Sequence, residues 1–479
     1  MKNILIYAPI AIFSPHFETD LEIAMRELSK GNKVSILPCK AKLINSCTEL
    51  ARDPDLCIVC KSRFNIGVKL LPQEVEILSW RNLSPRKDYN FDFKSLNDFN
   101  NFKYKEIEVG QFIISTFISI YREPKLDFNK HKIKLEKSLN EIIDLIDDFL
   151  VSVDLSQFDE CYLFNGRFSI LYPILKLFQL HDKKFYVHEG AGPLGYYSLS
   201  LGTYPHDLDY KKIEILETCK TGSAQDVEQI GQEWYYERRG RSKDESLPSF
   251  LSDQVKELLP DNFDTSKRNI SIFVSSEDEF VSINGWENPY FLNQNDGIKY
   301  ILQNLDHEQF KVYIRVHPCL KNIYNSQTEG LLLLKDEFKN AYFIDADAAI
   351  DTYALLEKSE KIISFGSTLG IEATFWRIPS LLAGRALYEG LNVCYVPKSK
   401  EDLISLINSN LLPRDKSGCL EFAYWLRKHG IKYEFFKPDG HFSGHFLDQK
   451  IKPSYLSRII YKIKKMSKVM KKENHEFQS

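Results

Sequence analysis

The sequence lacks the features that mark several large classes of protein. No apolar run approaches the length of a membrane span, and a net charge of -3 gives the chain no general attraction to nucleic acid. Nine cysteines in 479 residues are too few for a disulfide scaffold, so we expect a reducing, cytoplasmic environment. The opening MKNILIYAPIAIF has the look of a secretory signal, but Pro9 and Pro15 interrupt it and no small-residue cleavage site follows. We therefore predict that the chain begins with a buried strand.

Length and composition predict two folded domains. With 479 residues, 43% hydrophobic and 27% charged, the chain is long enough and apolar enough for two cores. We place the first domain at 1–240, with a polar and aromatic insertion at 84–135, and the second domain at 265–430. The polar stretch 238–268 is the expected linker, and 431–479 form a C-terminal segment.

The first domain opens with a βαβ pattern. Asn3–Tyr7 and Lys33–Leu37 are predicted strands, and Thr19–Ser29 between them has the helical period. This opening lacks the G-x-G-x-x-G fingerprint, so the pattern predicts a Rossmann-like fold without indicating a dinucleotide. His16 lies in the loop after the first strand, where ligands enter such sheets, although a lone histidine in a loop is more often simply solvated.

Two later strands of the first domain end in polar loops. Residues 161–164 run into Asn165-Gly166-Arg167, and residues 185–187 run into His188-Glu189-Gly190-Ala191-Gly192. Because parallel strands end at one edge of a sheet, we expect both loops to form one wall of a cleft. With a nearby His-Asp pair, this gives four candidate substrate-binding residues: Asn165, Arg167, His188 and His206.

A second α/β pattern begins at Asn269. Its predicted strands end in polar residues, Ser275 and Ser276 after the first strand and His317 after the second, which contains Arg315. We expect these four residues to lie at the binding edge of a second Rossmann-like sheet.

The stretch 361–384 combines a strand, a turn, a helix and a further strand. The turn Gly366-Ser367-Thr368 offers hydroxyls and backbone N–H groups that suit a phosphate. Glu372 lies one helical turn beyond Thr368, where its carboxylate could accept hydrogen bonds from ribose hydroxyls. The alternative is a Ser/Thr helix cap followed by an exposed glutamate.

Two groups of residues raise the question of a metal. Cys39, Cys47, Cys57 and Cys60 include one C-x-x-C pair, a spacing that suits zinc, but buried thiols are the favoured interpretation. The triplet 345–347, Asp-Ala-Asp, could bind a divalent ion, but it is more typical of a helix cap. We expect no catalytic metal.

The motifs S-S-E-D-E (275–279), R-V-H-P (315–318) and F-G-S-T-L-G-I-E-A (365–373) together resemble the bacterial capsule polysaccharide biosynthesis family. F-N-G-R (164–167) and H-E-G-A-G (188–192) add to this likeness. The resemblance implies the GT-B architecture, in which two Rossmann-like domains face each other across a cleft. It also implies a glycosyltransferase that uses a nucleotide sugar to build capsule or lipopolysaccharide O-antigen glycans on a glycan or lipid-linked acceptor.

The His-Pro and Ser/Thr motifs are also similar to those of bacterial sialyl- and Kdo-transferases, which use CMP-sugars. This likeness implies that His317 contacts the donor phosphate, that Ser367 and Thr368 hold it, and that Glu189 is the general base. Those enzymes usually show two acidic residues where this chain has a histidine before Glu189, and Asp207 is the next candidate for the base.

Other interpretations fit the same residues. Glu189 could pair with Arg167, and His317 could cap a helix. At the level of function, the alternatives are a nucleotide-sugar epimerase of the same fold and a non-catalytic protein of glycan assembly.

The C-terminal tail has a basic, amphipathic pattern. Residues 450–472 contain nine Lys or Arg and no acidic residue, and their apolar side chains fall largely on one helical face. We predict peripheral attachment to anionic lipid at the inner face of the cytoplasmic membrane. The alternatives are a solvated tail and a helix docked on the protein's own acidic surface.

Overall fold

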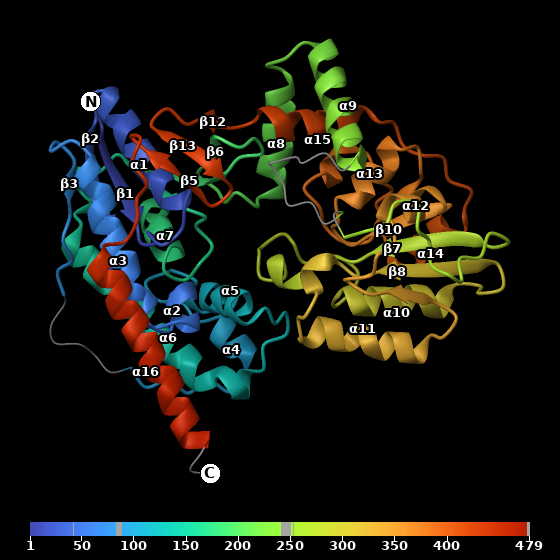
Figure 1. Cartoon of the computed structure of the whole chain (residues 1–479), viewed down its shortest axis with the longest axis horizontal. Coiled ribbons are helices and arrows are strands. Elements are labelled where there is room, and N and C mark those ends of the chain that lie inside the picture. The colour runs from blue at the N-terminus through green and yellow to red at the C-terminus, as the bar shows by residue number, and fades with distance from the viewer. Residues whose placement is uncertain (42, 83–88, 241–250, 252, 477–479) are drawn as a thin grey trace. The chain divides into compact units, whose positions relative to one another are not determined.

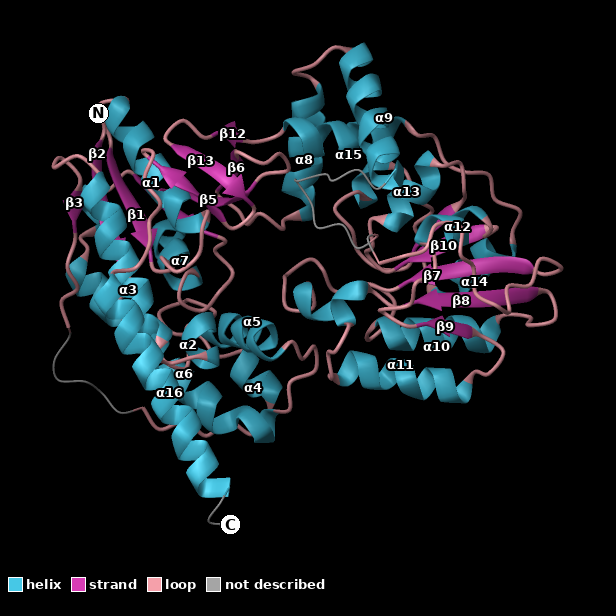
Figure 2. Ribbon diagram, viewed as in Figure 1, coloured by secondary structure: helices cyan, strands magenta, loops and turns pink. Residues whose placement is uncertain are grey.

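A computed structural model describes the chain apart from residues 42, 83–88, 241–250, 252 and 477–479 (Figure 1). The chain forms two compact units. Unit 1 comprises Met1–Tyr121, Leu126–Pro205 and Gly430–Ser479, and unit 2 comprises Arg122–Lys125 and His206–His429. In each unit a sheet lies among helices, as the magenta strands and cyan helices of Figure 2 show.

These units differ from the predicted domains at two places. Residues 206–240, expected in the first domain, belong to unit 2, where helices α8 (Leu208–Cys219) and α9 (Ala224–Gly240) pack against α15 (Ser417–Lys428). The segment after His429, expected to stand apart, returns to unit 1. Within the expected linker, 241–250 and 252 lie outside the described residues.

Unit 1 has a seven-stranded sheet in the order β12-β6-β5-β4-β1-β2-β3. The first five strands along the chain are parallel, and β6 and β12 add an antiparallel edge. The strands are β1 (Asn3–Ala8), β2 (Lys33–Pro38), β3 (Glu76–Ile77), β4 (Glu160–Phe164), β5 (Lys184–Gly190), β6 (Tyr196–Leu201) and β12 (Ile431–Lys432). A separate hairpin is formed by β13 (Phe436–Gly440) and β14 (Ser443–Phe446).

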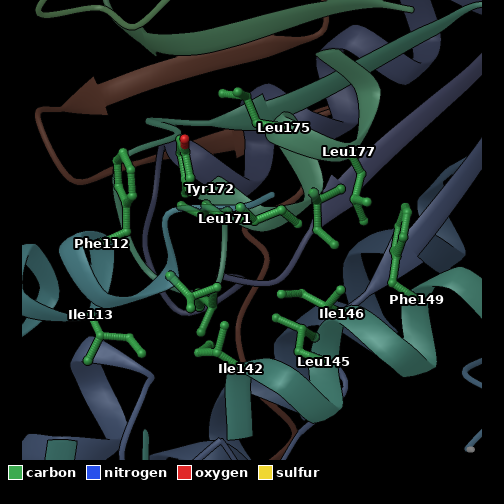
Figure 3. Close-up of a cluster of buried hydrophobic side chains, with 14 of the residues drawn as sticks. Phe112, Ile113, Ile142, Leu145, Ile146, Phe149, Leu171, Tyr172, Leu175 and Leu177 are labelled. Carbon is green, nitrogen blue, oxygen red and sulfur yellow. The ribbon is translucent and has the colours of Figure 1, made fainter. Parts of the chain in front are cut away.

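Both faces of this sheet are covered, which is why its central strands are continuous apolar runs. In β1, Leu5 and Tyr7 pack into one cluster, and Ile4 and Ile6 pack into the other. Figure 3 shows part of the first cluster, with Phe112, Ile142 and Leu171 among its members.

The helices of unit 1 are α1 (His16–Ser29), α2 (Thr48–Arg52), α3 (Leu56–Gly67), α4 (Leu96–Asn100), α5 (Val109–Tyr121), α6 (Phe128–Ser152), α7 (Tyr172–Leu180) and α16 (Tyr455–Glu476).

Part of the region 84–135, predicted to be an insertion, belongs to the core of unit 1. Helix α5 and the start of α6 bury side chains such as Ile113 and Phe117 in the first cluster, so they form part of the core. Residues 84–88 of the expected insertion lie outside the described residues.

Unit 2 has a five-stranded parallel sheet in the order β11-β10-β7-β8-β9. Its strands are β7 (Arg268–Phe273), β8 (Phe310–Arg315), β9 (Tyr342–Ile344), β10 (Lys361–Ser364) and β11 (Ser380–Leu382). Besides α8, α9 and α15, its helices are α10 (Gln294–Asn304), α11 (Ser326–Glu337), α12 (Thr352–Glu357), α13 (Leu369–Phe375) and α14 (Lys400–Asn408).

The strand orders define the fold class. In each unit the chain winds outward from a central strand, then returns and winds the other way, as in a doubly wound Rossmann-like domain. The prediction of an α/β protein with two Rossmann-like domains is confirmed. The order reverses between β1 and β4 in unit 1 and between β7 and β10 in unit 2, and ligands of such sheets bind beyond the carboxyl ends of the strands at these points. Among the described residues, no helix is both long and apolar enough to cross a membrane.

Candidate functional site

The clearest candidate site lies at the strand-order reversal of unit 2, where the loops after β7 and β10 meet. Gly366 follows β10 with a φ of 142°, a conformation that favours glycine. A Cβ atom at this position would lie 2.9 Å from the carbonyl oxygen of Arg385 and 3.4 Å from Oγ of Ser275. Ser275 after β7, Gly366 after β10 and Arg385 after β11 therefore approach one another so closely that there is little room for a side chain at position 366.

Hydrogen bonds hold the turn 366–368 in place. Ser364 Oγ accepts from the Gly366 N–H (3.1 Å) and donates to the Ser367 carbonyl (3.0 Å), which also accepts from the Tyr388 hydroxyl (2.6 Å). Thr368 is exposed and is the N-cap residue of α13, but its side chain makes no cap hydrogen bond. The predicted strand, turn and helix are all present, and hydrogen bonds from Ser364 and Tyr388 fix the turn to its neighbours.

The structure corrects the role predicted for Glu372. Its side chain is 0% exposed, and its carboxylate accepts from the Tyr353 hydroxyl (2.5 Å), from Arg238 Nη2 (3.1 Å) and from Thr368 Oγ1 (3.2 Å). A ribose cannot reach a carboxylate that is buried and already satisfied. Glu372 instead joins α13 to α9 and α12.

Ser275 and Ser276 are also buried, which corrects their predicted contact with the donor. Gln294 Nε2 donates to Ser275 Oγ (3.0 Å), and Gln327 Nε2 donates to the Ser275 carbonyl (2.8 Å). Ser276 Oγ donates to Asp278 Oδ1 (2.5 Å) and accepts from Arg122 Nη2 (3.1 Å). These bonds fix the loop after β7 to its neighbours.

His317 is a neutral hydrogen-bond donor at the end of β8. Its Nδ1 accepts from the Cys319 N–H (3.1 Å) and caps the short 3-10 helix Pro318–Leu320, as one of the two interpretations of the sequence expected. Burial, together with the charges of Arg122 and Arg315, lowers the pKa of His317 to about 4. Because Nδ1 is the acceptor, the proton of the neutral ring resides on Nε2.

Arg315 is 3% exposed and lies next to the Asp-Ala-Asp triplet. Its Nη2 donates to the Ala348 carbonyl (3.1 Å), and burial lowers its pKa to about 10 despite the charges of Asp345 and Asp347. Its burial corrects the predicted direct contact with a donor. The triplet was expected to cap a helix, but Asp351 is the residue that caps α12.

A cavity of about 280 Å³ adjoins the turn that follows β10. The aromatic rings of Phe280 and Trp286 stack there, with centroids 4.7 Å apart and planes 10° from parallel. Burial raises the pKa of the Glu277 carboxyl to about 7. This cavity was not predicted from the sequence, although the closely spaced aromatic residues of the run F-V-S-I-N-G-W-E-N, after S-S-E-D-E, were a signal for it. The main lining residues are Glu277, Phe280, Trp286, Asn288, Phe365 and Arg385.

His206 and Asp207 lie in unit 2, although they were expected in the first domain. The His206 carbonyl accepts from Trp286 Nε1 (2.7 Å), which links it to the aromatic wall of the cavity. Asp207 is the N-cap of α8 and accepts from the Tyr210 N–H (2.9 Å). Capping of α8 is therefore a sufficient structural role for the Asp207 side chain.

Unit 1 presents its own polar cluster at the carboxyl ends of β4 and β5. Asn165, with a φ of 56°, donates from Nδ2 to Glu189 Oε2 (2.9 Å), and the Gly190 N–H donates to Oε1 (3.3 Å). Glu189 remains partly exposed, as a base must be. Arg167 donates to Ser119 Oγ (3.1 Å) and lies over the ring of Phe168.

The structure corrects the role predicted for His188. The side chain is 0% exposed, and its Nε2 lies 2.8 Å from Oδ1 of Asp20 on α1. Burial raises the pKa of Asp20, and the adjacent His188 only partly offsets this rise. His188 therefore supports the strand beneath Glu189 and does not face a substrate.

His16, which the sequence alone did not single out as a site residue, lies beside Glu189 in this cluster. It is the first residue of α1, and its ring centroid lies 3.9 Å from that of Phe164. Burial lowers its pKa, and the charge of Glu189 raises it only in part, so His16 is neutral at pH 7 beside a carboxylate. The signal in the sequence was its position in the loop after the first strand, where ligands enter such sheets.

Two of the four cysteines considered for zinc, Cys39 and Cys60, lie in surroundings that keep their thiols protonated. Among the residues that the structure describes, no group of three or more His, Cys, Asp or Glu is placed to hold a metal ion. Burial raises the pKa of the Cys60 thiol to about 12 and also raises that of Cys39, so both stay protonated.

Comparisons with known proteins add no close relative. No family model matches the sequence, and a search of curated proteins gave no match. Among solved structures, the chain is similar to the β-Kdo 2,4 transferase KpsC of Thermosulfurimonas dismutans, with 11% identity and a TM-score of 0.35 over 56% of this chain and 79% of that one. It is similar to the UDP-GlcNAc 2-epimerase of Methanocaldococcus jannaschii, with 12% identity and a TM-score of 0.28 over 90% and 100% of the two chains. It is also similar to MurG of Acinetobacter baumannii, with 12% identity and a TM-score of 0.25 over 90% of this chain and 96% of that one.

These neighbours include transferases and an epimerase, and at such low scores they assign no activity. The fold class follows instead from the strand orders of the two units.

Proposed function

We propose that the protein is a glycosyltransferase that moves a sugar from a nucleotide-sugar donor to a growing surface glycan in capsule or lipopolysaccharide O-antigen biosynthesis. One observation carries the proposal. At the strand-order reversal of unit 2, a hydrogen-bonded Gly-Ser-Thr turn adjoins an aromatic-walled cavity of about 280 Å³. The combination offers separate places for the phosphates and for the nucleoside of a donor.

The donor would bind with its phosphates at residues 366–368 and its base near Phe280 and Trp286. The exposed Thr368 supplies a hydroxyl, and the uncharged imidazole of His317 lies at the next strand end. CMP is one candidate nucleotide, on the strength of the motif resemblance. A hydrogen-bond donor that is already held in place stabilises the charge on the departing phosphate and need not reorganise during the reaction.

The acceptor side of the reaction would use Glu189. Its carboxylate takes the proton of an acceptor hydroxyl, the hydroxyl oxygen attacks the anomeric carbon, and the bond from that carbon to the phosphate oxygen breaks. Asn165 and the Gly190 N–H hold the carboxylate in position, and His16 stands beside it as a neutral group. That Glu189 and His317 face one interdomain cleft remains a prediction. We place the reaction in the cytoplasm, at the inner face of the cytoplasmic membrane.

Nucleotide binding to unit 2 is the first test. A thermal-shift screen of CMP, UDP, GDP and CDP should show stabilisation by at least one of them, because a ligand that binds only the folded chain raises its stability by mass action. Gly366→Ala should lose this stabilisation, since its Cβ would lie 2.9 Å from the Arg385 carbonyl oxygen.

The matched control is Gly240→Ala, where nothing lies within 4 Å of the added atom. A control that responds like the parent protein would show that glycine replacement alone has no effect. If no nucleotide stabilises the parent protein, the proposal fails in favour of a non-catalytic assembly protein.

A further inference from the structure

Helix α16 is held to unit 1 by its polar side. The Tyr461 hydroxyl donates to Asp53 Oδ2 (2.7 Å), and Lys464 Nζ lies 3.5 Å from Asp55 Oδ1. Ser457 on the same side is buried. Figure 1 shows the red α16 running alongside α3, and the two helices are in contact.

The apolar side of α16 is turned outward. Leu456, Ile460, Ile463 and Met466 recur at helical spacing and are 67%, 37%, 60% and 63% exposed. This reverses the usual arrangement, in which a surface helix buries its apolar stripe against the core. Tyr461 and Lys464 therefore dock on acidic residues of the protein itself, as one alternative expected, and the described residues of unit 1 leave the apolar stripe uncovered.

Charge indicates what covers this stripe. Residues 450–472 contain nine Lys or Arg and no acidic residue, and Arg458, Lys462 and Lys465 are exposed beside the stripe. A lysine-rich border is unfavourable at the core of a protein interface, where lysine is depleted. It suits a negatively charged lipid surface, which attracts each basic residue lying close to it.

We propose that α16 lies in the plane of an anionic membrane surface, with Leu456, Ile460, Ile463 and Met466 inserted among the lipids. Arg458, Lys462 and Lys465 would contact the headgroups, while Asp53 and Asp55 keep the helix fixed to unit 1. Because its polar side is already docked, the helix presents the stripe in one fixed orientation. The proposal does not depend on sugar transfer, but it accounts for how a lipid-linked acceptor would be reached.

The test is sedimentation of the full-length protein with vesicles of phosphatidylcholine, alone or with phosphatidylglycerol. The parent protein should bind only vesicles that contain phosphatidylglycerol, and added salt should weaken the binding. The variant I460Q/I463Q should lose about tenfold or more in affinity, because it loses two inserted apolar side chains. Lys462→Gln should lose about fivefold.

Ile133→Gln on α6 is the matched control, since Ile133 is also an exposed isoleucine, at 69%. Its binding should equal that of the parent protein. Equal binding to neutral vesicles, or unchanged binding by I460Q/I463Q, would overturn the proposal. So would a dimer of the parent protein that becomes a monomer in I460Q/I463Q, because a second copy would then be what covers the stripe.

Discussion

At the scale of single residues, environment decides which polar side chains can react. Glu189 and His188 are neighbours in β5, yet Glu189 is partly exposed and His188 is fully buried against Asp20. The alternation of side chains along a strand separates them onto opposite faces. Sequence alone showed that both were polar and at a strand end, but burial depends on α1, which supplies Asp20 from 168 positions away.

Replacing Glu189 by Gln should remove the base and keep the hydrogen bond from Asn165. We expect turnover to fall by about 10²–10⁴-fold, the usual contribution of a positioned base, with donor binding almost unchanged. Steady-state kinetics beside calorimetric donor titration would measure both effects. Glu217→Gln on the exposed surface of α8 is a control that should leave turnover intact. Near-full turnover in the folded Glu189 variant would rule out the assignment.

Glu277 should make stability depend on pH. Burial raises the pKa of its carboxyl from 4.5 to about 7, so the folded chain keeps this proton where the unfolded chain has released it. The contribution of this carboxyl to the free energy of unfolding is complete below pH 4.5. It is lost as the pH rises to about 7, which lowers the free energy of unfolding by about 3 kcal/mol.

Denaturant unfolding across this pH range would measure the slope of stability against pH. Glu277→Gln should remove the part of the slope that belongs to this carboxyl. An identical slope in the variant and the parent protein would show that Glu277 does not hold its proton.

At the scale of elements, apolar runs and turn residues predicted most of the two sheets. The strand Lys361–Ser364, the turn 366–368 and the helix α13 lie where the sequence placed them. The face of α13 that is buried was not predictable from its own residues. It is set by Arg238 of α9 and Tyr353 of α12, which bind Glu372 from 134 and 19 positions away. The burial of Ser275 was not predictable from its own segment either, because its partners Gln294 and Gln327 belong to helices α10 and α11.

The link between α9 and α13 gives a prediction that separates stability from binding. Glu372→Ala should leave Arg238 largely buried without its partner and lower the free energy of unfolding by about 3 kcal/mol. Denaturant unfolding would measure this loss. In the folded fraction, nucleotide affinity should stay close to that of the parent protein, because Glu372 faces no ligand.

The matched partner is E372L/R238M, which removes both charges and should recover much of the stability. A folded, fully stable Glu372→Ala that binds nucleotide poorly would restore the ribose contact that the sequence suggested.

At the scale of the whole molecule, the chain divides differently from its linear pattern. The last segment of the chain returns to unit 1, where the β13–β14 hairpin packs against α1 and the N–H groups of Phe435 and Phe436 donate to the buried Glu22. Such a return leaves little trace in local periodicity, because it depends on pairing between residues about 400 positions apart. The fold class was accessible from the sequence since each βαβ unit is local.

The most direct measurement of the central claim is product analysis after incubation with nucleotide sugars in the absence of acceptor. We expect slow hydrolysis of a single donor, with release of free sugar and nucleotide, because water replaces the acceptor hydroxyl at Glu189. Formation of an isomeric nucleotide sugar, with the nucleotide still attached, would contradict it and identify an epimerase.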